Sequence, residues 1–153
     1  MPSELHEKLC LKAVSWLKNN GFGVAAMNVW AFGSRERADC IGFRQQCSVL
    51  IEVKVSRADF LADRKKPERF SGGFGNYRFY LAPAGLLDVT DLPKGWGLLE
   101  YQRKVELVHG PSGNIWPSEK NAIGTDWQEY IHASCQEAER SFLYTLARKQ
   151  QSV

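Results

Sequence analysis

The sequence predicts an α/β (α+β) fold in which a mixed central sheet is flanked by helices. Apolar residues recur at helical spacing near both ends of the chain. A strongly alternating strand lies at residues 48–55, and a strand–helix–strand segment spans residues 48–81. The 153 residues fit a single domain, 1–153, that is long enough to bury a hydrophobic core without disulfides.

The first predicted element is a helix that begins after Ser3, a favourable N-cap residue. It ends at residues 19–21, where Asn-Asn-Gly supplies a stop. On a helical wheel, Glu7 lies at the margin of the apolar face, beside Val14. The apolar positions that define this face are Leu5, Leu9, Ala13, Trp16 and Leu17.

Three strands are predicted next, with a turn at residues 33–35 after the first of them. They cover residues 24–30, 38–43 and 48–55. In the third strand the odd-numbered positions form one β-branched face, so Glu52 and Lys54 share the other face.

The remaining elements complete the order αβββαβ, followed by a strand pair and a C-terminal helix. Ser56 is placed to cap the second helix. A loop rich in Gly, Pro, Ser and Asn is predicted at 110–124. The short connection at 44–47 implies an antiparallel hairpin, and the segment 48–81 implies a parallel crossover. The predicted elements are a helix over 57–64, a strand over 77–81, strands over 96–101 and 104–108, and a last helix bearing Cys135, Ala138, Phe142, Leu143 and Leu146.

The hairpin brings two carboxylates together. An even-numbered loop centred on Gln45 and Gln46 pairs Asp39 directly with Glu52. Paired side chains share a face, with Cβ atoms roughly 5 Å apart. Lys54 lies on that face too, two residues beyond Glu52.

Two carboxylates at that separation repel each other unless a cation lies between them, and hard oxygen ligands suit Mg²⁺ or Mn²⁺. The carbonyl of Val53 is a further candidate ligand, and Lys54 would stabilise an attacking hydroxide or charge on a phosphate. These parts suffice to hydrolyse a phosphodiester. The alternative is a solvated strand face with Asp39 as an ordinary strand-end residue.

The same residues carry a family resemblance. Asp39, followed by Glu52-Val53-Lys54 on the next strand and preceded by a helix bearing Glu7, resembles the PD-(D/E)XK nuclease superfamily. The run from Glu52 to Pro67, with Arg37-Ala38-Asp39-Cys40, 77–83 and 95–100, is similar to the MmcB-like DNA-repair branch and to related phage or prophage proteins. The resemblance covers about residues 4–108.

This resemblance implies a restriction-endonuclease-like core and a DNA nuclease or nickase of repair or phage DNA processing. Asp39 and Glu52 would ligate magnesium or manganese, Lys54 would assist hydrolysis, and Glu7 would be an outer acidic partner. Val55 and Lys66 depart from the MmcB-like pattern, which usually has a small polar residue and tryptophan there. The superfamily also has members that keep the fold without activity.

Several polar residues near the predicted site are candidates for DNA contact. They are Ser34, Arg35, Arg37, Ser56, Lys65 and Lys66. Exposed turn arginines are the alternative for those before Asp39. The basic segment from Arg64 to Arg78 contains Phe70, Phe74 and Tyr77, which would either stack on bases or fill the core.

Other residues have plainer interpretations. Trp30 is expected to pack in the core, with base stacking as the alternative. Asp59 and Asp63 are expected to pair with nearby basic residues, and the three histidines to be surface or packing residues. The four cysteines lack metal-ligand spacing and suit buried free thiols.

Composition limits the other possibilities. The net charge of +3 permits an anionic partner without requiring one. The sequence shows no secretory signal or membrane-length apolar run, so a cytoplasmic location and no membrane partner are expected. A catalytically inactive module that binds DNA or protein, such as a phage accessory protein that inhibits a host enzyme, is the alternative function. One small domain has little surface for reading sequence, so duplex cleavage would need a homodimer or yield nicks.

Overall fold

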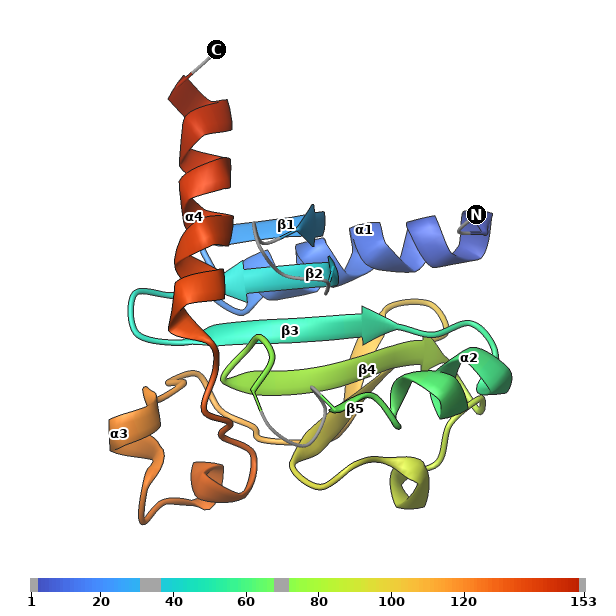
Figure 1. Ribbon diagram of the computed structural model, residues 1–153. Helices are drawn as coiled ribbons and strands as arrows, with labels where there is room; N and C mark the ends of the chain where they lie inside the picture. Colours follow the sequence, from blue (N-terminus) through green and yellow to red (C-terminus); the bar gives the residue numbers. More distant parts are fainter. Residues whose placement is uncertain (1–2, 31–36, 68–71, 152–153) are drawn as a thin grey trace.

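The computed structural model describes residues 3–30, 37–67 and 72–151. Its centre is a six-stranded mixed sheet in which the strands follow the sequence order from β1 to β6, with helices on both faces (Figure 1). The predicted fold class is confirmed. The elements are α1 (Glu4–Asn19), β1 (Val24–Trp30), β2 (Arg37–Phe43), β3 (Ser48–Val53), α2 (Arg57–Asp63), β4 (Tyr77–Pro83), β5 (Trp96–Tyr101), β6 (Val105–His109), α3 (Glu119–Ala122) and α4 (Gln136–Gln151).

Strand directions follow the expected connections. β2 is antiparallel to both β1 and β3, while β4 is parallel to both β3 and β5. β6 returns antiparallel to β5. Cys40 pairs with Ile51 and Phe43 with Ser48, which confirms the hairpin register predicted from the loop length.

Most predicted boundaries are within one or two residues of the observed ones; β4, for example, runs to Pro83 rather than to residue 81. β3 ends at Val53 rather than at residue 55, because the chain turns there toward Ser56, whose hydroxyl accepts a hydrogen bond from the Asp59 N–H and caps α2. The predicted loop at 110–124 contains α3, which Ser118 caps through the Asn121 N–H.

Helices cover both faces of the sheet. Leu9, Cys10, Ala13 and Leu17 bury one side of α1 against one face, and α2 and α4 contribute Phe60 and Phe142 to the core on the other. As a result, all six residues of β3 are buried. The polar strand face predicted from alternation is therefore not solvated, and Glu52 lies inside the protein.

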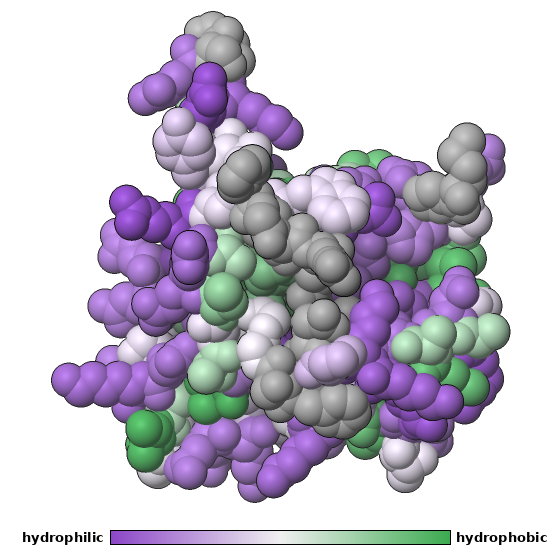
Figure 2. All heavy atoms as spheres, in the orientation of Figure 1, coloured by the Kyte–Doolittle hydropathy of each residue, from purple (hydrophilic) through white to green (hydrophobic). Residues whose placement is uncertain are grey.

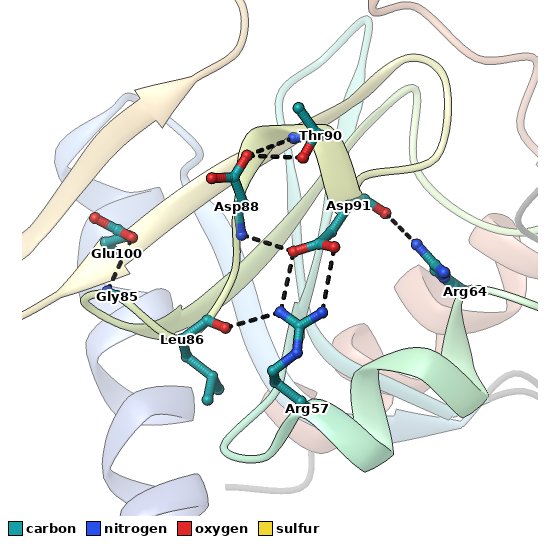
Figure 3. A network of polar contacts seen from close by, with 8 residues as sticks. All are labelled: Arg57, Arg64, Gly85, Leu86, Asp88, Thr90, Asp91 and Glu100. Atoms are coloured by element: carbon teal, nitrogen blue, oxygen red, sulfur yellow. Dashed lines mark hydrogen bonds and ion pairs between the residues drawn. The ribbon is translucent and has the colours of Figure 1, made fainter.

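Helix α2 is fixed to the segment after β4 by an ion-pair network (Figure 3). The Arg57 guanidinium donates to both carboxylate oxygens of Asp91, at 3.0 and 3.3 Å, and to the Leu86 carbonyl at 3.2 Å. Arg64 donates to the Asp91 carbonyl at 2.9 Å. These contacts, from both ends of α2, set the position of the side chains that it directs toward β3.

Helix α4 is docked by its first half and projects from the body with its second half (Figure 1). Glu139 accepts a hydrogen bond from the Gly75 N–H at 2.7 Å, and Phe142 is fully buried with its ring 4.7 Å from that of Phe74. The projecting end is covered by hydrophilic side chains (Figure 2). No helix within the described ranges has the length and apolar character needed to cross a membrane.

Candidate active site at one end of the sheet

The end of β3 and the starting half of β2 form the candidate site. The tips of β1 and β3, the first half of α1 and helix α2 all lie at this end of the sheet, on the right in Figure 1. Asp39 comes from β2 and Glu52 from β3. Both are buried, with 6% and 3% of their surfaces exposed.

Asp39 occupies a point where the hairpin opens. Regular pairing between β2 and β3 ends at Cys40 and Ile51. Beyond that pair, the Asp39 carboxylate accepts a hydrogen bond from the Val53 N–H at 2.9 Å. The side chain thus takes the place of a backbone partner, because a buried strand N–H left without an acceptor would be costly.

The neighbouring strand is irregular at the same level. Asn28 lies between the pairs Met27–Cys40 and Val29–Ala38, at the level of Asp39. Its φ is 55°, which is uncommon for a residue other than glycine. On one side of this point Met27 contacts the core beneath α1, whereas on the other side Val29 belongs to the opposite core. At Asn28, next to the buried carboxylates, the side chains of β1 therefore change from one face of the sheet to the other.

Hydrogen bonds hold Asp39 in its charged form. Burial by itself would raise the pKa of Asp39, but hydrogen bonds from His6 and from the Val53 N–H, and one shared with the carboxyl group of Glu52, outweigh it. Together they lower the pKa of Asp39 to about 2. The carboxyl groups of Asp39 and Glu52 are thus close enough to share a hydrogen bond.

His6 joins the site from α1, which the sequence did not predict. Its Nε2 lies 3.5 Å from Asp39 Oδ2, and its Nδ1 lies 3.7 Å from the Cys10 sulfur one helical turn away. The hydrogen bond to Asp39 raises the pKa of His6 despite partial burial. The sequence feature that could have indicated a role for His6 is its spacing from Cys10, four residues away on the buried side of the helix.

Glu7 does not complete a group of three carboxylates with Asp39 and Glu52. Within the described residues, no three or more His, Cys, Asp or Glu side chains are placed together to hold a metal ion. Successive helical residues are about 100° apart around the axis, so the helix that directs His6 at Asp39 directs its neighbour elsewhere.

The donor set at the site nevertheless fits a small hard cation. Asp39 and Glu52 supply carboxylate oxygens. The N–H and C=O of a strand residue point to the same neighbour, so the Val53 carbonyl faces the same opening as its N–H. Magnesium is commonly bound through one or two carboxylates and keeps several waters, so two carboxylates and a carbonyl are sufficient protein ligands.

Lys54 is held beside the carboxylates by an ion pair. Its Nζ lies 3.2 Å from Asp63 Oδ1. Asp63, on α2, is 2% exposed and also accepts a hydrogen bond from the Tyr80 hydroxyl at 2.6 Å. Lys66 Nζ is 3.3 Å from the same aspartate oxygen. The prediction that Asp63 pairs with nearby basic residues is confirmed.

The candidate DNA contacts have different surroundings. Arg37 Nη2 lies 3.9 Å from Asp39 Oδ1, at the entrance to the site. Lys65 and Lys66 are exposed after α2, while the Ser56 hydroxyl is used as the α2 cap. Ser34 and Arg35 lie outside the described residues.

The aromatic residues separate into core and surface. Phe74 and Tyr77 are buried, which favours the core-filling interpretation for that loop; Phe70 lies outside the described residues. Arg78 is buried as well and donates to the Gly75 and Gly72 carbonyls. Trp30 is 55% exposed, so the expectation that it packs in the core is wrong.

The other polar residues mostly behave as expected. Cys10, Cys40 and Cys47 are buried free thiols, although Cys135 is exposed.

A cavity of about 780 Å³ is lined by residues that include Arg44, Glu119 and Arg140. It adjoins the β2–β3 turn, at the opposite end of β3 from Glu52, and is separate from the candidate site.

Comparisons with known proteins give a fold and no activity. No protein-family model matches the chain, and no curated protein matches it. A similar solved structure is SPO1766, a protein of unknown function from Silicibacter pomeroyi. It is 24% identical, with a TM-score of 0.58 over 92% of this chain and 85% of that one. At this identity the likeness shows a shared fold.

Proposed function

We propose that the protein is a metal-dependent DNA phosphodiester hydrolase, an endonuclease or nickase of DNA repair or phage DNA processing. One observation carries the proposal: Asp39 and Glu52 are in contact inside the protein where two strands separate, with Lys54 held nearby. Burying two adjacent carboxylates costs free energy, which a bound cation between them would offset. Holding such a cation would be their use. The PD-(D/E)XK resemblance in the sequence supplies that use.

Each residue has a distinct part in this scheme. Asp39, Glu52 and the Val53 carbonyl would hold Mg²⁺ or Mn²⁺, and Glu7 stays a predicted outer acidic partner. When bound, the cation would polarise the scissile phosphate and help to ionise a water. The Val53 N–H and His6 orient the Asp39 carboxylate. The Lys54 ammonium would offset negative charge as it builds on the phosphate oxygens.

The test compares nicking of supercoiled DNA, and cleavage of single-stranded, duplex, forked and flapped DNA, with and without magnesium. We expect Asp39→Ala, Glu52→Gln and Lys54→Ala each to lower the rate by about 10²-fold or more, the size of loss seen for electrostatic groups at such sites. Glu106→Gln, on the exposed strand β6, is the matched control. Circular dichroism would verify folding.

Undiminished cleavage by all three variants would contradict the assignment. So would cleavage that persists unchanged when every divalent cation is removed by a chelator.

A catalytically inactive binding module is the second candidate. It is favoured by the absence, within the described ranges, of any group of three acidic, histidine or cysteine side chains placed to hold a metal. The two candidates differ in metal binding, because a ligand that binds only the folded state raises the melting temperature. Magnesium or manganese should stabilise the hydrolase, and the Glu52→Gln variant should lose that stabilisation.

A further inference from the structure

Trp30 is an exposed tryptophan at the end of β1, beside the candidate site. The four other tryptophans are in aromatic contacts: Trp16, Trp116 and Trp127 in one cluster, and Trp96 stacked on Tyr80. Trp30 instead leaves 55% of its surface in solvent. Exposing so much apolar area forgoes stabilisation that burial would provide. Single exposed apolar residues are common on protein surfaces, so the neighbours of Trp30 decide whether it is suited to contact a ligand.

Arg37 links Trp30 to the carboxylates. The two residues are a directly opposed pair on β1 and β2, so their side chains share a face. The Arg37 guanidinium carbon lies 5.9 Å from the centroid of the Trp30 ring. Its Nη2 lies 3.9 Å from Asp39 Oδ1. Trp30, Arg37 and Asp39 therefore form a row from solvent to the buried site.

We propose that Trp30 and Arg37 form a binding platform for one unpaired nucleotide of single-stranded or locally opened DNA. Identifying the ligand as DNA rests on the proposed function. The indole would stack on the base, and the arginine would contact its phosphate, the combination that recurs in proteins that bind single strands. In an intact duplex the faces of the bases are already stacked on one another, so an exposed indole has little to bind.

The position of the platform suits a nucleotide close to the scissile one. Trp30 is one strand and two residues away from Asp39, which corresponds to a straight distance of roughly 8 Å between the two backbone positions by ordinary strand spacings. A strand bound at Asp39 would therefore pass Trp30 within about one nucleotide. The platform thus assigns a substrate class, DNA with an unpaired segment, to the end of the sheet that holds Asp39 and Glu52.

The experiment measures binding without cleavage. Fluorescence anisotropy in chelator-containing buffer would compare a labelled oligothymidylate with a blunt duplex of equal length. We expect Trp30→Ala to weaken single-strand binding by about 10-fold or more, the usual effect of removing a stacking aromatic, with duplex binding nearly unchanged. Trp30→Phe should retain most of the affinity, since it keeps an aromatic face. Arg37→Gln should weaken binding and reduce its salt dependence.

The control is Tyr144→Ala, because Tyr144 is also an exposed aromatic, 63% exposed, but lies on α4. Equal single-strand affinity of wild type and Trp30→Ala overturns the proposal, as does an equal loss for duplex or no single-strand binding at all. A dimer, measured by light scattering, that dissociates in Trp30→Ala would also overturn it, because Trp30 would then be a subunit contact.

The outcomes for the platform and for the hydrolase are separable. Metal-dependent cleavage at equal rates by wild type and Trp30→Ala refutes the platform, and the hydrolase proposal still holds. Trp30-dependent binding of single strands without cleavage under any metal supports the platform and contradicts the hydrolase.

Discussion

Asp63 is the residue through which helix α2 reaches the candidate site. Its carboxylate is almost fully buried, and it contacts Lys54 at 3.2 Å and the Tyr80 hydroxyl at 2.6 Å. A lysine side chain has considerable rotational freedom, and an ion pair with a buried, hydrogen-bonded partner restricts it. Asp63 is therefore a positioning residue that acts through Lys54.

Changing Asp63 to Asn should lower the rate of DNA cleavage by about 10-fold or more, mainly in kcat, because Lys54 loses its fixed counter-charge. Unfolding by denaturant should show a loss of stability of about 1–3 kcal/mol, since the variant also weakens a buried charge network. The same substitution in a Lys54→Ala background should have little further effect on the rate. Glu106→Gln is the control, because Glu106 lies on the exposed strand β6 and pairs with Lys104 rather than with a residue of α2.

Equal rates for wild type and Asp63→Asn would show that Lys54 needs no such partner. A full additional loss in the Lys54→Ala background would show that Asp63 acts by another route.

At the scale of elements, the docking of α4 depends on a small apolar contact. The helix buries Ala138 and Phe142 on the core that also contains Phe74, and Glu139 binds the Gly75 N–H. Beyond Phe142 the helix projects from the body, with Tyr144 in solvent (Figure 1). The stabilisation that α4 contributes is thus concentrated in its first two turns.

Phe142→Ala should destabilise the protein by about 3–5 kcal/mol, the usual cost of deleting a fully buried phenylalanine. Tyr144→Ala should change stability by less than about 0.5 kcal/mol, because its ring is exposed. Urea denaturation followed by circular dichroism would measure both. Similar losses for the two variants would mean that the projecting half of α4 is packed in solution.

At the scale of the whole molecule, a half-buried histidine joins distant segments and couples stability to pH. His132 lies beside the start of β5, with its Nε2 2.9 Å from the Gly95 carbonyl oxygen, and its backbone N–H donates to the Asn76 carbonyl. Burial lowers the pKa of His132 to about 4, against the hydrogen bond to Gly95 and with the help of Arg78. The folded protein therefore holds this side chain neutral at pH values where the unfolded chain is protonated.

The sign of the effect follows from that difference. Below a pH of about 6.5 the unfolded state binds a proton at this position before the folded state does, so the free energy of unfolding should decrease as pH falls to about 4. The loss would be at most about 3 kcal/mol, and smaller with solvent screening. Denaturation curves from pH 7 to 4.5 would show it, and His132→Gln should flatten them.

Asp39 and His6 also make stability depend on pH, but in other pH ranges than His132. The stabilisation from charged Asp39 is lost only as pH falls from about 4 toward about 2. The stabilisation from protonated His6 is already complete below a pH of about 6.5 and is lost as pH rises through its raised pKa. A wild-type curve that is level between pH 6.5 and 4.5 would contradict a His132 that stays neutral in the folded protein.

The sequence by itself determined the order of elements and the hairpin register that brings Asp39 near Glu52. Both depend on local information: residue periodicity sets the helices and strands, and a short loop sets the register of an antiparallel pair. The observed pairing of Cys40 with Ile51 follows directly from the length of that loop. Ser3 and Ser56 were likewise predictable as caps, because capping involves only the next three residues.

Only the tertiary structure decided the surroundings of these residues. Helices on both faces of the sheet bury Glu52, although strand alternation alone predicts a polar face. His6 reaches Asp39, and Lys54 reaches Asp63, through the packing of α1 and α2 on the sheet. Trp30 is exposed because its strand lies at an edge of the sheet. Burial and contact between separate elements depend on how those elements are stacked, and residue periodicity within one element carries no information about that stacking.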